Sequence, residues 1–79
     1  MSGYNGWKNR QTWNIALWIN NDESLYRGAI DYVKQAKIVT YQMYLEHAGL
    51  KGAYTPDGIK FDGSRLDYKA LTEMLKEML

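Results

Sequence analysis

The fold depends first on the stretch Asn9-Arg10-Gln11-Thr12-Trp13-Asn14-Ile15-Ala16-Leu17-Trp18-Ile19-Asn20-Asn21-Asp22. Read as a helix, residues 12–20 are apolar nearly all round, which is typical of a central, buried helix. Read as a strand, the same residues alternate fairly well between two faces. Asn9 is a suitable N-cap, and the polar residues 20–22 are suited to end one helix and cap the next. We therefore predict a helix, with a strand as the alternative.

Length and composition indicate one small globular domain covering residues 1–79. The chain has no cysteine, so neither a disulfide nor a thiolate zinc site can stabilise it. Aromatic residues make up 14% of the sequence, with seven tyrosines and three tryptophans. Because a chain of this size buries only a small core, stability must come from packing of these aromatic and aliphatic side chains, or from a partner chain.

Three further segments have helical spacing of apolar residues. The second helix is predicted to begin after Asp22 and to end near Lys37, or else to bend there and continue. Gly28 inside this helix suggests a close helix crossing. The third ends at Gly49, which suits a left-handed C-terminal residue, and Asp67 caps the last. The predicted fold class is mainly α, with a small α+β fold as the alternative: three to four short helices surround one core, and a small β-hairpin is placed at about 53–61.

Residues 50–66 differ in character from the rest of the chain. Pro56-Asp57-Gly58 is a strong turn signal between two short runs, 53–55 and 59–61. A small β-hairpin fits this pattern. The alternative is an ordered loop held in place by Tyr54, Ile59 and Phe61.

Charge and motifs exclude several function classes. The net charge is +1 and the charges are interspersed, which does not favour direct nucleic-acid binding or mimicry of DNA. No apolar segment reaches membrane-spanning length. The carboxylates of Asp57, Asp62 and Asp67 recur every five residues, which does not match a calcium loop. The lone His47 has no catalytic partner and lies near a helix end. We predict no catalytic residue, no metal, no cofactor and no enzymatic activity.

The N-terminal third resembles small accessory proteins of phages, prophages and plasmids. The resemblance covers roughly residues 4–26 and rests on the pattern N-G-W-x-N-R-x-T-W-x-x-A-L-W-x-x-N-D-E, which begins here at Asn5. One departure is Gln11, where these proteins usually have Glu. The setting of such proteins in mobile DNA implies functions directed against host defences, in the cytoplasm of a bacterial host.

The resemblance implies an anti-CRISPR-type inhibitor that binds a subunit of a type I (Cascade) effector and blocks access to target DNA. Two alternatives are a phage regulatory or assembly module that binds nucleic acid or another phage protein, and a sponge for a nucleotide signal. Hot spots of protein interfaces are enriched in Trp, Tyr and Arg. The residues predicted to bind the partner, because loop or end positions can expose them, are Trp7, Arg10, Tyr54, Lys60 and Arg65.

Overall fold

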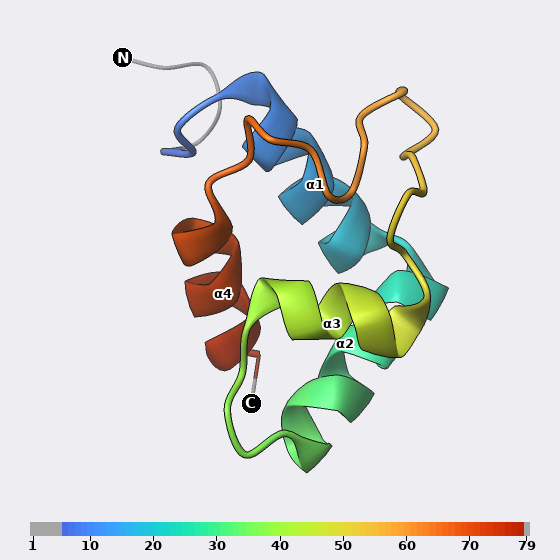
Figure 1. The fold of residues 1–79 in the computed structure, drawn as a ribbon, viewed down its shortest axis with the longest axis vertical. Coiled ribbons are helices and arrows are strands. Elements are labelled where there is room, and N and C mark those ends of the chain that lie inside the picture. Colours follow the sequence, from blue (N-terminus) through green and yellow to red (C-terminus); the bar gives the residue numbers. More distant parts are fainter. Residues whose placement is uncertain (1–5, 79) are drawn as a thin grey trace.

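Four α-helices follow one another within residues 6–78, the part of the chain that the computed structural model describes. They are α1 (Arg10–Asn21), α2 (Glu23–Gln35), α3 (Tyr41–Ala48) and α4 (Tyr68–Lys76), as Figure 1 shows. The predicted mainly α fold is confirmed. Residues 12–20 lie in a helix, so the strand alternative for them is wrong.

Each helix begins at a side chain that accepts a hydrogen bond from the backbone N–H three residues further on, at 2.9–3.1 Å. These N-caps satisfy donors that have no partner inside the helix. Gly49 ends α3 with φ of 70°, the left-handed conformation that glycine adopts without strain. The N-cap residues are Asn9, Asp22, Thr40 and Asp67.

The core lies where α1 packs on α2, α2 on α3, and α4 on the other three helices. Each large apolar side chain buried there contributes roughly 1.5–3 kcal/mol relative to an exposed one. The largest fully buried apolar and aromatic side chains are Ile15, Ile19, Tyr41, Tyr44, Leu45, Leu71 and Leu75.

Buried tyrosines also fix the arrangement of the helices through their hydroxyl groups. Tyr32 Oη accepts from the backbone N–H of Thr40 at 3.0 Å and donates to the carbonyl of Ile38 at 3.2 Å. Tyr44 Oη donates to the carbonyl of Leu25 at 3.1 Å. The first tyrosine thereby closes the turn between α2 and α3, and the second ties α3 to the first turn of α2.

The structure decides three local predictions, which concern the end of α2, Gly28 and the hairpin. Helix α2 ends at Gln35, so it does not continue through residues 36–40. A Cβ added at Gly28 would meet nothing within 4 Å, so the prediction of a close helix crossing there is wrong. The hairpin at 53–61 consists of a single antiparallel bridge between Tyr54 and Lys60. Within residues 6–78, no helix has the length and apolar character needed to cross a membrane.

Candidate functional site

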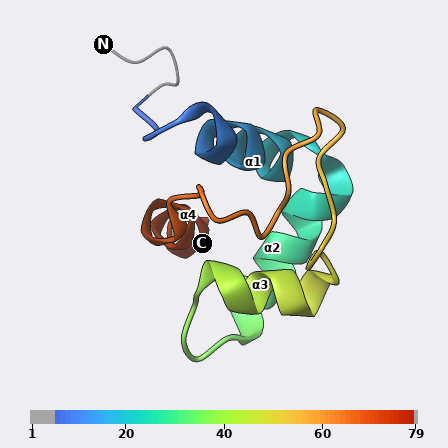
Figure 2. The same ribbon diagram turned by 45° about the horizontal axis from the view of Figure 1, so that its top comes forward.

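The connection between α3 and α4, residues 49–67, runs along α1 before it returns to α4 (Figures 1 and 2). Connections longer than about 12–15 residues without their own helix or strand are uncommon, and those that are ordered are usually functional. We call residues 53–66 the anchored loop, because α1 holds this segment at two places.

The first attachment joins the start of α1 to the end of the anchored loop. Thr12 Oγ1 donates to Asn9 Oδ1 at 2.7 Å and accepts from the backbone N–H of Asp67 at 3.0 Å. Asn9 Nδ2 donates to the carbonyl of Arg65 at 2.8 Å. Since Asn9 and Asp67 are the N-caps of α1 and α4, one buried hydroxyl links the two helix starts and the loop between them.

The second attachment lies further along α1 and holds the turn of the anchored loop. Asn14 Nδ2 and Trp18 Nε1 both donate to Asp57 Oδ2, at 2.8 and 2.9 Å. Asn14 Oδ1 accepts from Thr55 Oγ1 at 2.9 Å. Asn14 is only 1% exposed, and its amide is therefore satisfied on both sides by loop residues.

These contacts also set the electrostatics of the turn. The hydrogen bonds from Asn14 and then Trp18 lower the pKa of the Asp57 carboxyl below its ordinary value of 3.8, and the positive charge of Arg10 lowers it further. Asp57 is exposed to solvent, and its carboxylate is both ionised at neutral pH and hydrogen-bonded to α1. The turn is thereby held to α1 by charge-assisted hydrogen bonds.

The other side of the anchored loop faces the core. Phe61 and Leu66 are buried, and the hydroxyl of Tyr41 donates to the carbonyl of Phe61. The hydroxyl of Tyr68 donates to the carbonyl of Gly63 at 2.7 Å. The loop is therefore fixed from both sides, by polar groups of α1 and by the tyrosines that begin α3 and α4.

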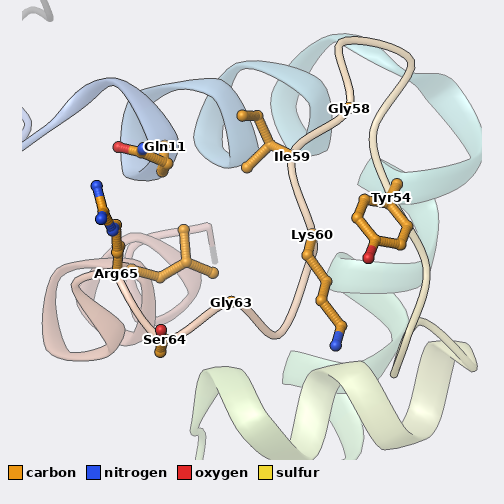
Figure 3. Close-up of a pocket in the computed structure, with 9 residues that line it drawn as sticks. Gln11, Tyr54, Gly58, Ile59, Lys60, Gly63, Ser64 and Arg65 are labelled. Carbon is orange, nitrogen blue, oxygen red and sulfur yellow. The ribbon is translucent and has the colours of Figure 1, made fainter.

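A hollow of about 260 Å³ opens between the anchored loop and the first turn of α1. Figure 3 shows Gln11 and Arg65 at one end of it and Tyr54 and Lys60 at the other, with Ile59 between them. Its lining is partly apolar and carries two cationic side chains and no carboxylate. Such a lining suits an occupant that has both an apolar part and a negative charge.

A family model matches residues 1–79, and its description is a family of unknown function, DUF7249. The chain belongs to the DUF7249 family. No curated protein and no solved structure gives a significant match. The family match covers the whole chain, whereas the resemblance described above concerned roughly residues 4–26. The family match assigns no role to any residue.

The structure brings three of the five predicted site residues together. Tyr54, Lys60 and Arg65 line the same hollow and are exposed. Arg10 is exposed on α1 and does not line the hollow, and its positive charge lowers the pKa of the Asp57 carboxyl. Trp7 is half-buried, packs against the core and does not line the hollow.

Sequence reasoning missed the residues that attach the loop. Thr12 and Asn14 lie inside the helix that was predicted to be central and buried, and Trp18 was assigned only to its apolar surface. A signal was present, because a buried polar side chain needs a hydrogen-bond partner. Gln11, noted above only as a departure from a pattern, proves to line the hollow.

Two sets of titratable groups in the described residues bear on the chemistry of the protein: the potential metal ligands and the buried tyrosines of the core. Among the described residues, no three His, Cys, Asp or Glu side chains are grouped as metal ligands would be. Burial raises the pKa of Tyr44 to about 12, with a smaller contribution from the negative charge of Asp22, and burial also raises that of Tyr41. These hydroxyl groups therefore stay protonated at neutral pH and serve as hydrogen-bond donors. What the arrangement presents to solvent is a fixed loop with exposed Tyr, Lys and Arg side chains.

Proposed function

We propose that this protein is an anti-defence inhibitor of the anti-CRISPR type, which binds an effector of a type I (Cascade) system and blocks its access to target DNA. The observation that carries the proposal is the anchored loop, which holds exposed Tyr54, Lys60 and Arg65 in one place. The resemblance of residues 4–26 to phage and plasmid accessory proteins supplies the class of target. Inhibition would be stoichiometric and would act through contact alone.

Attachment of the loop to α1 favours tight binding. A loop that must become ordered on binding loses affinity, at roughly 0.5–1.5 kcal/mol for each side chain that is immobilised. Here Asn14 already holds the side chains of Thr55 and Asp57, and Thr12 holds the backbone N–H of Asp67. The free protein therefore presents the loop in the conformation in which the partner would meet it.

The exposed side chains are of the kinds that dominate binding energies. Tyr54 is 61% exposed, and tyrosine is enriched at interfaces because it combines a large apolar ring with a polar hydroxyl group. Tyr and Arg are enriched among hot-spot residues, and they tend to lie near the centre of an interface. A typical interface hides about 800 Å² on each partner, so the contact would extend from the loop onto neighbouring α1, including Arg10 and Gln11.

The size and charge of the site favour a protein partner over a nucleotide or a nucleic acid. A hollow of about 260 Å³ is smaller than the roughly 300–1,000 Å³ of pockets that enclose a small-molecule ligand, so it suits a side chain better than a whole nucleotide. The anchored loop carries two cations, Lys60 and Arg65, and two carboxylates, Asp57 and Asp62. This balance does not suit the row of phosphates in a nucleic acid.

The test is a plaquing assay in hosts that carry different defence systems, with and without the protein, followed by a pull-down from the host that responds. We expect rescue of phage that a type I system otherwise stops, with an effector subunit in the pull-down. Rescue should be lost with Tyr54→Ala and kept with Tyr26→Ala, because Tyr26 is also exposed, at 41%, but lies on α2 and does not line the hollow. No rescue in any host, with the folded protein present, would contradict the proposal and favour a regulatory or assembly role.

A further inference from the structure

Three positively charged side chains lie at or beside the hollow, and they differ in their neighbours. Lys60 Nζ is 3.9 Å from Asp62 Oδ1, and Arg10 acts on the carboxylate of Asp57. Arg65 forms no ion pair with any carboxylate in the described part of the chain. Of the two cations that line the hollow, Lys60 and Arg65, it is therefore the guanidinium of Arg65 whose charge no ion pair within residues 6–78 compensates.

The backbone that carries Arg65 is nevertheless held firmly. Its carbonyl accepts from Asn9 Nδ2 at 2.8 Å, the next side chain, Leu66, is buried, and the N–H of Asp67 is bound by Thr12. The side chain points toward Gln11 across the end of the hollow (Figure 3). A guanidinium on a fixed backbone, next to a side-chain amide that can also donate, is suited to receive a planar carboxylate through two parallel hydrogen bonds.

Building on the proposed function, we infer that the hollow receives an aspartate or glutamate side chain of the partner protein. The carboxylate lies between Arg65 and Gln11, and the adjoining apolar residue of the partner packs against Ile59 and Leu66. Tyr54 closes the other end of the contact. The charge of Arg65 and the size of the hollow both match one acidic side chain.

A phosphate of nucleic acid is the competing occupant, and the surrounding charges disfavour it. Double-stranded DNA carries about one negative charge per 1.7 Å of helix axis, so a strand placed on this face would bring several phosphates close to Asp57 and Asp62. Both carboxylates belong to the anchored loop. A single carboxylate needs only the one uncompensated cation that the site offers.

This assignment also constrains how inhibition works. Surfaces that bind DNA do so with Lys and Arg side chains, so an acidic segment on the effector lies outside the path of the DNA phosphates. The protein would therefore bind beside that path and obstruct access to it sterically. It would not occupy the DNA groove in place of phosphates.

The first test does not depend on the identity of the partner. Backbone amide NMR shifts would be followed while the tripeptide Leu-Glu-Leu, acetylated at its N-terminus and amidated at its C-terminus, is added, with Leu-Gln-Leu blocked at both ends as the matched neutral probe. We expect shifts around Gln11 and residues 63–66 with the acidic peptide, and binding weakened about 10- to 100-fold by Arg65→Gln. Lys37→Gln, which removes an exposed positive charge between α2 and α3, should leave binding unchanged. Equal responses to the two peptides, no response at these residues, or a stronger response to inorganic phosphate or a short DNA strand would overturn the inference.

The second test uses a purified type I effector complex. We expect Arg65→Glu to weaken binding at least about tenfold, and an Asp→Arg or Glu→Arg exchange at the contacted residue of the effector to restore it. Lys37→Glu is the control for the change in net charge. Unchanged affinity of Arg65→Glu would refute the carboxylate site and leave the inhibitor function standing. A positive peptide experiment without binding of the wild type to any type I effector would refute the inhibitor function and leave the site standing.

Discussion

Replacing Thr12 by valine tests whether one hydroxyl links the starts of α1 and α4. Thr12 is fully buried, and valine has nearly the same shape and a comparable helix propensity. The substitution removes the hydrogen bond to Asn9 and leaves the backbone N–H of Asp67 without its acceptor. A typical hydrogen bond contributes about 1 kcal/mol net, and a buried donor left unsatisfied costs about 1–3 kcal/mol. We expect the free energy of unfolding to fall by about 2–4 kcal/mol.

That loss is large for a domain of this size. At roughly 0.05–0.15 kcal/mol per residue, total stability is about 4–12 kcal/mol, and each kcal/mol shifts the melting temperature of such a small domain by about 4–8 °C. Thermal and urea unfolding followed by circular dichroism would measure the change. Thr12→Ser is the control, because it keeps the hydroxyl and loses only a methyl group. If Thr12→Val is as stable as the wild type, or more stable than Thr12→Ser, the argument that this hydroxyl holds the loop is refuted.

Three further predictions concern single groups. The folded-state pKa of Asp57 is lowered, so the stability that this carboxylate contributes is complete above pH 3.8 and is lost as the pH falls through the folded-state pKa. Acid unfolding of Asp57→Asn should lack this component, and identical acid profiles of the variant and the wild type would contradict the assignment. The folded-state pKa of Tyr44 is raised to about 12, so stability should fall as the pH rises from about 10 toward 12, and Tyr44→Phe should make this alkaline decline less steep in urea titrations. Gly49→Ala should lower the free energy of unfolding by about 1–2 kcal/mol in urea melts, because φ is 70° there and an added Cβ meets no neighbour; no loss would show that α3 can end another way.

Local features of the sequence predicted the helices well. The N-cap functions of Asn9, Asp22 and Asp67 and the C-terminal glycine at 49 could be recognised because each depends on residues within four positions along the chain. The turn at 56–58 was recognised in the same way. The hairpin was predicted less well, because a strand pair depends on distant partners that a short alternating pattern does not specify.

The candidate site could be predicted only in part. Composition and turn signals indicated that Tyr54, Lys60 and Arg65 would lie on a loop, but nothing in the sequence placed them around one hollow with Gln11. Their convergence depends on where the loop returns to α1, which is more than 40 positions away in sequence. For the same reason the sequence did not decide whether Trp7 packs on the core or is an exposed binding residue, and the fold packs it partly against the core.

By itself, the sequence determined where α1, α2 and α4 begin and where α3 ends, since capping is satisfied by neighbours along the chain. Only the tertiary structure decided what the polar residues of α1 do. Thr12 and Asn14 are compatible with many surroundings as sequence letters, and their functions appear only when residues 55, 57 and 67 reach them. The physical reason is that a buried polar group needs a hydrogen-bond partner, but the group's position in the chain does not indicate which distant residue that partner is.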